Sequence, residues 1–376
     1  MITPFTVQIS QTVLDDLQSR LKNIRWTDEI IGSQWRYGAG LSYMQELATY
    51  WMNKFDWRKV EDEINSHPNF LAEIDGYKIH FLYVRGKGKK SFPIIITHGW
   101  PGSFLEMTKL IPLLTTDAEF SFDLVIPSMP GFGFSQKLNT TGCNSSFMAD
   151  LWYGLMKELG YEKFGAQGGD FGAAVSTAMA LKYPQHMSGL HLNYIPGSYK
   201  PYLPGNEILT TEEIQFEKNT ADWYRREGAY SHQQATKPLT LAYGLNDSPV
   251  GLCAWITEKF YGWSDCKNNI ENVFTKNEIL ANVTLYWVTE SIHSSIRLYN
   301  ENSQVPFHFS KDEYVNVPVG IAKFPVEEPF PPRKFIERGY NIRHWTDMPT
   351  GGHFAAMEQP ALLANDITSF FKKISS

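Results

Sequence analysis

The sequence contains little cysteine, has no long apolar run and carries no excess of positive charge. Three cysteines occur among 376 residues, Cys143, Cys253 and Cys266, at spacings that match neither a disulfide framework nor a zinc ribbon. No stretch approaches the roughly 18 consecutive apolar residues of a membrane-spanning helix, and no signal peptide opens the chain. We therefore expect a soluble, cytoplasmic protein with reduced thiols and no membrane partner.

Charge and motif content further restrict the classes of molecule that the protein can bind. The formal net charge of −6 leaves no basic excess to neutralise phosphates, which argues against nucleic acid and anionic lipid. The run from Gly131 to Ser135 begins like a dinucleotide fingerprint but lacks its third glycine, and no His-Glu-x-x-His or similar metal spacing occurs. We expect a small uncharged substrate, no cofactor and no metal. The oligomeric state is left open, with a homodimer as one option.

The apolar pattern divides the chain into an α/β core and two helical additions. Hydrophobic residues make up 43% of the sequence, enough for a sizeable core. After a helical beginning, a hairpin turn at Asp75-Gly76 opens a region in which short strands and helices alternate. This alternation predicts a mostly parallel sheet with helices on both faces. The expected segments are a helical meander, a first core part, an aromatic-rich helical lid and a second core part, over residues 1–70, 71–195, 196–314 and 315–376.

The most informative pentapeptide is Gly168-Gly169-Asp170-Phe171-Gly172, between an expected strand and an expected helix. It resembles the nucleophile elbow of α/β-hydrolases, in which flanking glycines permit a strained turn that lifts the central side chain above the sheet. An Asp after a strand commonly just caps the next helix, but capping does not explain glycines on both sides. A carboxylate at this place can displace a leaving group at an sp³ carbon and leave an ester for water to cleave. We therefore predict that Asp170 is a nucleophile.

A second glycine-containing loop, from His98 to Gly102 (HGWPG), follows a continuous apolar strand. Without the elbow, a simple turn with a core histidine would be the better interpretation. In the α/β-hydrolase fold such a loop supplies one backbone N–H of the oxyanion hole, and the residue after the nucleophile supplies the other. The expected donors are the N–H groups of Trp100 and Phe171. Just downstream, Ser103 and Glu106 have the spacing of a helix-capping box.

A third loop, from Gly351 to Phe354 (GGHF), follows the last expected strand. Its His353 stands where the chain order nucleophile, acid, histidine would place a general base. The base needs an orienting carboxylate, and Glu327 follows the strand after which this fold places one. Glu328 and Asp347 remain rivals, the first by adjacency and the second by nearness to the loop. Histidines within strand-like stretches are expected to be structural, namely His80, His191 and His344.

With these residues, the chain resembles the microsomal-type epoxide hydrolases of the α/β-hydrolase superfamily over nearly its whole length. Lid stretches similar to that family's run from Gly228 to Tyr230, from Leu245 to Leu252 and from Arg297 to Tyr299. The resemblance implies that Tyr230 and Tyr299 donate hydrogen bonds to an epoxide oxygen, a task suited to phenols because they stay protonated at neutral pH. Mammalian members carry a membrane-anchoring helix before the meander. This chain has none, so we expect no microsomal localisation.

The implied activity is hydrolysis of an apolar epoxide to a vicinal diol through an ester on Asp170. A haloalkane dehalogenase would share the Asp nucleophile and the histidine, but it commonly places an indole N–H beside the nucleophile, where Phe171 cannot donate. A catalytically silent protein that binds an apolar ligand is the other alternative, since intact residues do not guarantee productive geometry. The sequence does not identify the epoxide, the carbon attacked or the enantiopreference.

Overall fold

A computed structural model describes residues 1–205 and 208–375 of the chain. In this part, the strands form one nine-stranded sheet with the order β1-β2-β3-β5-β4-β6-β7-β8-β9. The pairs β1–β2, β2–β3 and β3–β5 are antiparallel, and the other five pairs are parallel. The predicted mostly parallel sheet is therefore confirmed. The strands are β1 Ile2–Pro4, β2 Asn69–Ile74, β3 Tyr77–Val84, β4 Lys90–Thr97, β5 Phe120–Pro127, β6 Phe164–Gly168, β7 Met187–Leu192, β8 Val315–Lys323 and β9 Tyr340–Asp347.

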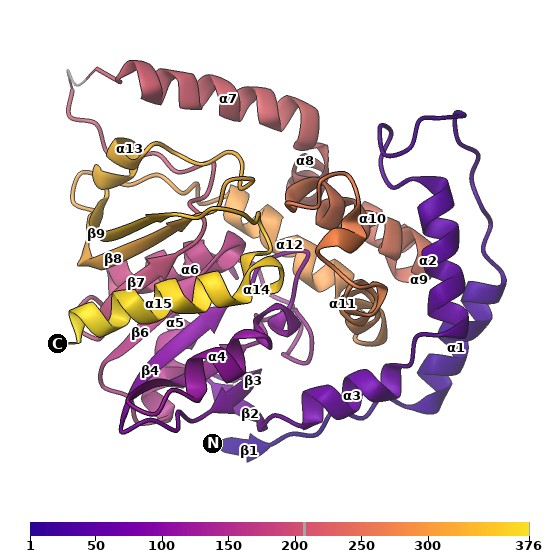
Figure 1. Ribbon diagram of the computed structural model, residues 1–376, viewed down its shortest axis with the longest axis horizontal. Coiled ribbons are helices and arrows are strands. Elements are labelled where there is room, and N and C mark those ends of the chain that lie inside the picture. The colour runs from indigo at the N-terminus through magenta and orange to yellow at the C-terminus, as the bar shows by residue number, and fades with distance from the viewer. Residues whose placement is uncertain (206–207, 376) are drawn as a thin grey trace.

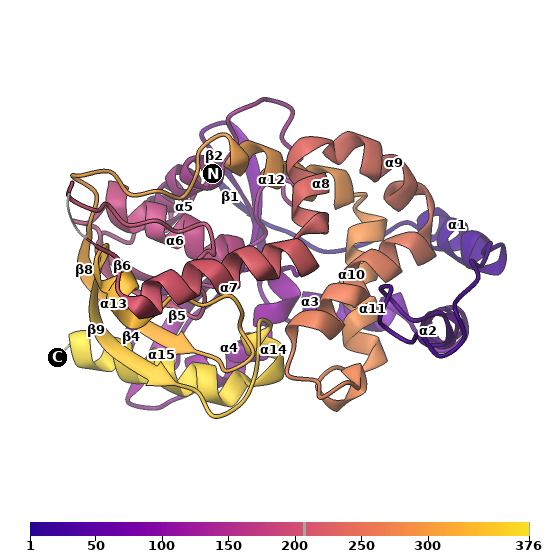
Figure 2. The ribbon, with the colours of Figure 1, turned by 90° about the horizontal axis from the view of Figure 1, so that it is seen from above.

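Helices cover both faces of the sheet. In β4, Ile95 belongs to one hydrophobic cluster and Ile94 and Ile96 to the other, because successive side chains of a strand point to opposite faces. Figure 2 shows α5 and α6 on one side of the sheet and α4 and α15 on the other. The helices of the core are η1 Phe104–Met107, α4 Leu110–Thr115, α5 Ser145–Glu158, α6 Asp170–Lys182, α13 Arg333–Glu337, α14 Ala355–Glu358 and α15 Pro360–Ile374.

Between β7 and β8 the chain leaves the sheet and forms a group of helices beyond the carboxyl ends of the parallel strands (Figure 1). This insertion corresponds to the expected lid, of which residues 206 and 207 lie outside the described part. The boundaries of the four predicted segments stay an interpretation of the pattern. The inserted helices are α7 Thr211–Glu227, α8 Ala229–Thr236, α9 Pro238–Asp247, α10 Pro249–Trp263, η2 Ile270–Asn272, α11 Lys276–Val288 and α12 Ile292–Ser303.

The amino-terminal helices α1 Gln11–Lys22, α2 Leu41–Asn53 and α3 Trp57–Asn65 pack against this insertion, with α1 and α2 beside α10 (Figure 1). The first 70 residues are not wholly helical, however. Ile2–Pro4 forms the edge strand β1 and pairs with β2. A strand of three residues is too short to show an alternation of apolar and polar side chains, so the sequence pattern did not reveal it.

The three cysteines are buried and form no disulfide, as predicted. Burial raises the pKa of the Cys253 thiol to about 12, which makes this group unreactive at neutral pH. Among the described helices, none combines the length and the apolar composition that crossing a bilayer requires.

Close packing at the start of α6 gives a test of stability. A Cβ on Gly172 would lie 2.0 Å from the carbonyl oxygen of Thr97, at the end of β4. We expect Gly172→Ala to lower the free energy of unfolding by about 1–3 kcal/mol, because helix and strand must move apart. Gly244→Ala in α9 is the matched control. Nothing lies within 4 Å of its added Cβ, so this change should be neutral or stabilising by up to ~1 kcal/mol. Urea unfolding measures both, and equal stabilities of the two variants would contradict the close approach.

Candidate active site

Asp170 stands on a strained turn between β6 and α6. Its φ is +48°, in the left-handed region that side chains disfavour. The neighbouring glycines are required by close contacts, since a Cβ on Gly168 would lie 2.2 Å from the carbonyl oxygen of Gly172. The first turn of α6 can therefore sit directly against the end of β6. The result is a carboxylate held above the carboxyl edge of the sheet, as the elbow pattern predicts.

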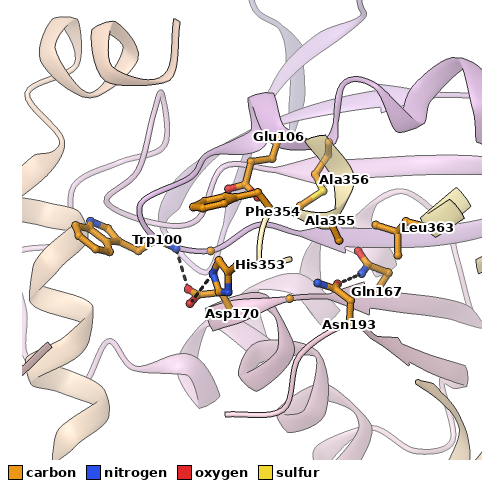
Figure 3. Close-up of a pocket in the computed structure, with 13 residues that line it drawn as sticks. Trp100, Glu106, Gln167, Asp170, Asn193, His353, Phe354, Ala355, Ala356 and Leu363 are labelled. Carbon is orange, nitrogen blue, oxygen red and sulfur yellow. Dashed lines mark hydrogen bonds and ion pairs between the residues drawn. The ribbon is translucent and has the colours of Figure 1, made fainter. Parts of the chain in front are cut away.

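The loop after β4 brings a backbone donor to this carboxylate. The N–H of Trp100 donates to Oδ1 of Asp170 over 2.9 Å (Figure 3). Gly99 makes the approach possible, because a Cβ at that position would lie 2.3 Å from the Cβ of Asp170. Phe171 follows Asp170 in α6, and its ring meets that of Tyr299 edge-on at 4.7 Å. Trp100 is thus in place as a donor, and the N–H of Phe171 stays a prediction from its position in the chain.

His353 lies between two carboxylates. Its Nε2 is 3.4 Å from Oδ2 of Asp170, and its Nδ1 is 3.0 Å from both carboxylate oxygens of Glu327. Glu327 is buried, only 4% exposed, just after β8. The two rivals are exposed: Glu328 makes no such contact, and Asp347 accepts from the indole N–H of Trp345. The geometry therefore favours Glu327 as the partner of the histidine.

The two carboxylates set the protonation of His353. Burial lowers the pKa of this histidine. The negative charges of Glu327 and Asp170, and the hydrogen bonds of His353 with both carboxylates, outweigh the effect of burial. The pKa of His353 consequently lies well above its ordinary value. With both carboxylates ionised, the imidazole holds its proton and forms a charged triad with them.

Tyr230 on α8 and Tyr299 on α12 reach the same place from the insertion. Their rings are 5.8 Å apart, and both side chains line a cavity of about 460 Å³ together with Asp170. Burial raises the pKa of both phenols well above 10, and the negative charge of Asp170 adds to this. Both tyrosines are therefore hydrogen-bond donors at neutral pH.

Three cavities meet at Asp170. The one shared with Tyr230 and Tyr299 has an apolar wall that includes Phe307 and Phe309. A second cavity, of about 310 Å³, reaches Asp170 and His353 from a more polar side. A third, of about 20 Å³, lies behind the carboxylate and is lined by Asp170, His353, Glu106, Gln167 and Asn193 (Figure 3). The carboxylate is thus reachable both from an apolar pocket and from a space of water size.

The sequence pattern did not identify Glu106 as part of the site. Ser103 caps η1 by accepting from the N–H of Leu105, and the buried Glu106 carboxylate, which lies over Gly102, has a hydrogen bond with the backbone of Ser103. A Cβ at Gly102 would overlap with that carboxylate, so the glycine was the available signal. Burial, and to a smaller extent the charge of Asp170, raise the pKa of Glu106 to about 8 against the opposing charge of His353. A neutral carboxylic acid therefore faces the small cavity at pH 7.

Tyr194, which the sequence pattern also missed, follows β7 and lines both larger cavities. Its ring lies edge-on to His353, with 5.8 Å between the centroids. No local signal marked it among 19 tyrosines.

The histidines expected to be structural are held by polar contacts with neighbouring side chains. His80 contacts Ser128 and Asn69, at 2.9 and 3.0 Å, and His191 and His344 share the carboxylate of Asp366, at 2.9 and 2.8 Å. In the described part of the chain, no three side chains of His, Cys, Asp or Glu converge so as to hold a metal ion.

Two protein-family models match the chain. The model of the epoxide hydrolase N terminus matches residues 2–107, and the model of the alpha/beta hydrolase fold matches residues 93–240. Epoxide hydrolase 1 of Oryctolagus cuniculus is 39% identical, over 98% of this chain and 88% of the relative. Juvenile hormone epoxide hydrolase 2 of Ctenocephalides felis is 36% identical, over 98% of this chain and 85% of the relative.

Solved structures agree over the whole length. The Aspergillus niger epoxide hydrolase has a TM-score of 0.88 at 31% identity, covering 100% of this chain and 97% of its own. The juvenile hormone epoxide hydrolase of the silkworm Bombyx mori has a TM-score of 0.87 at 30% identity, covering 100% and 94%. The chain therefore belongs to the epoxide hydrolase family of the α/β-hydrolase fold.

Proposed function

We propose that this epoxide hydrolase converts an apolar epoxide and water to a vicinal diol through a hydroxyalkyl ester on Asp170. One observation carries the proposal. A single carboxylate receives the N–H of Trp100, lies against the His353–Glu327 pair and shares a cavity with two phenols. A nucleophile, a base and two acids thus meet at one point, as opening and hydrolysis of an epoxide require.

In the first step, Asp170 attacks an epoxide carbon. Oδ1 accepts from Trp100, and Oδ2, which lies 3.4 Å from Nε2 of His353, forms the new C–O bond. The ring C–O bond breaks, and its electron pair goes to the epoxide oxygen. Tyr230 and Tyr299 donate hydrogen bonds to this oxygen, and one of them gives it a proton. Their raised pKa values keep both phenols protonated until that negative charge develops.

In the second step, His353 first releases to solvent the proton that it holds in the free enzyme, a proton that it regains from the Asp170 carboxylic acid once the ester has been cleaved. The neutral imidazole then removes a proton from a water that adds to the carboxyl carbon of the ester. The N–H groups of Trp100 and Phe171 hold the resulting oxyanion, and its collapse expels the diol, which takes the proton back from His353. Ester formation prepares this step, because it removes the Asp170 charge that helps to hold the proton on His353. The cavity of about 20 Å³ beside both groups has room for one water, which needs roughly 10–15 Å³.

The rival activities make different demands on the same pocket. A haloalkane dehalogenase needs side-chain donors for halide beside the nucleophile, and Phe171 offers a hydrocarbon ring there. An assay for chloride release from haloalkanes separates this activity from epoxide opening. A silent binding protein would bind an epoxide without turnover.

The proposal also covers the class of epoxide, the cellular location and the oligomeric state. The apolar wall of the larger cavity supports an apolar epoxide, and a panel of styrene oxide, terpenoid epoxides and fatty-acid epoxides would identify the preferred type. We also retain the cytoplasmic location and the homodimer as hypotheses, which cell fractionation and light scattering would test.

The origin of the diol oxygen tests the ester. In a single turnover with excess enzyme in heavy-oxygen water, we expect the first diol to carry no label, because its new hydroxyl oxygen comes from Asp170 and the label enters the carboxylate instead. Mass spectrometry of the diol gives the answer. Label in the first diol would show that water attacks the epoxide directly.

Substitution of the base should separate the two steps. We expect His353→Gln to open styrene oxide but to hydrolyse the ester about 10²–10⁴ times more slowly, because no group then activates water. Intact-protein mass spectrometry should show an adduct of one substrate molecule per chain. Asp170→Asn is the control and should show none. An adduct on Asp170→Asn would place the covalent chemistry elsewhere.

The protonated state of Glu106 predicts a pH dependence of stability. Its pKa is about 8 in the folded chain against 4.5 for an ordinary Glu, so the folded state holds a proton that the unfolded state releases. The stabilising effect is therefore fully present below pH 4.5 and is lost as the pH rises towards 8, at up to ~1.4 kcal/mol per pH unit. Glu106→Gln cannot ionise and should lose this slope, whereas the exposed Glu119→Gln should keep it. Urea unfolding at several pH values measures the slopes, and parallel curves for wild type and Glu106→Gln would contradict the assignment.

A further inference from the structure

Lys259 is a buried lysine beside the proposed acid Tyr230. It lies on α10, one turn before the end of that helix, and is only 4% exposed. Lysines are rarely buried without a partner, since removing an ammonium from water is costly. Its Nζ contacts Glu258 at 2.6 Å, and it stands over two aromatic rings, 4.4 Å from the centroid of Tyr230 and 5.5 Å from that of Trp263.

The Tyr230 ring is fixed in this position by its other neighbours. It stacks on the indole of Trp100, with 5.6 Å between the centroids and 9° between the planes, and it contacts Trp263 at 5.1 Å. The ammonium therefore acts on a phenol that has little freedom to turn away. Among the cation–ring contacts of the described chain, none involves Tyr299. The two proposed acids thus differ in their electrostatic surroundings.

This asymmetry bears on which phenol gives up its proton. A positive charge near a phenol stabilises the phenolate more than the phenol, and the effect is large in a site with little water. The surroundings of Tyr230 otherwise oppose ionisation. Burial and the charges of Asp170 at the elbow, Tyr224 on α7 and Glu258 on α10 disfavour the phenolate, whereas the hydrogen bond with Tyr299 on α12 favours it. The positive charge of Lys259 opposes these effects when negative charge develops on Tyr230.

We propose that Lys259 is a positioning residue that acts through Tyr230, stabilising the phenolate formed on epoxide opening and making Tyr230 the proton donor, with Tyr299 as hydrogen-bond donor only. The proposal rests on the epoxide opening described above. In that step the proton leaves the Tyr230 hydroxyl for the alkoxide oxygen of the hydroxyalkyl ester, and the negative charge moves onto a ring that faces the ammonium. Reprotonation of the phenolate by solvent completes the cycle.

The test is the rate of epoxide opening in single turnovers with excess enzyme and styrene oxide as probe. We expect Lys259→Met to slow opening roughly tenfold or more, the size of effect that a desolvated cation–ring contact can supply. Lys259→Arg keeps a cation over the ring and should retain most of the rate. Lys276→Met is the matched control. Lys276 is also a poorly exposed lysine of the insertion over a tyrosine, 5.9 Å from the ring of Tyr43, with Glu46 and Glu271 as partners, and its loss should leave opening unchanged.

A double-mutant cycle distinguishes action through Tyr230 from a general effect on packing. In a Tyr230→Phe background, Lys259→Met should cost almost nothing further, whereas in a Tyr299→Phe background it should cost its full factor. Lys259→Gln also removes the positive charge and keeps the test decisive if Lys259→Met does not fold, since a wild-type rate of opening in folded Lys259→Gln would overturn the proposal.

Other results would also overturn the role of Lys259. These are a wild-type rate in Lys259→Met, an equal loss in both tyrosine backgrounds, or no rescue by arginine. These outcomes leave the proposed function intact as long as the wild-type chain opens epoxides. A wild-type chain that opens none of the panel would overturn the proposed function itself, and the role of Lys259 with it.

Discussion

The site depends on the close approach of the first turn of α6 to the end of β4. Only glycine at position 172 lets the helix come within reach of the Thr97 carbonyl, and only glycine at position 99 lets the next loop come against the side chain of Asp170. Asp170 accepts a left-handed backbone conformation to stand at this junction. Such strain persists only where the surrounding packing fixes it. Here two strands, a helix and a loop do so, and the carboxylate is directed by backbone contacts rather than by its own flexibility.

The charge of this one carboxylate acts on several titratable groups around it. It favours the proton on His353, and it disfavours ionisation of Tyr194, Tyr230, Tyr299 and Glu106. Conversion of the carboxylate to an ester would remove all these effects in a single step. The base would then release its proton more readily, and the phenols would ionise with less penalty. The chemical intermediate itself would thus change the site from one suited to ring opening to one suited to hydrolysis.

Three of the residues that the sequence predicted stand where the backbone is constrained. Asp170, Trp100 and His353 lie in glycine-containing loops at strand ends, and the geometry requires those glycines, so the pattern is visible in the sequence. Tyr230 and Tyr299 came only from the resemblance, because helical tyrosines carry no such mark. Lys259 could not be found in this way, since its burial follows from how separate segments pack, and a lysine in a helix looks like a surface residue.

The end of α10 connects the two halves of the proposed chemistry. The carbonyl of Trp263 accepts from the N–H of His353, and the Asp265 carboxylate accepts from the N–H of Gly351, so the histidine loop is bonded to the insertion. Glu358 accepts from the N–H groups of Asp265 and Phe354, which closes this connection from the other side. The same helix end carries Lys259 against Tyr230. Hydrogen bonds thus join the end of α10 to the loop of the proposed base, and side-chain contacts of Trp263 and Lys259 join it to the proposed acid. The insertion is therefore better understood as one wall of the candidate active site than as a loose cover over it.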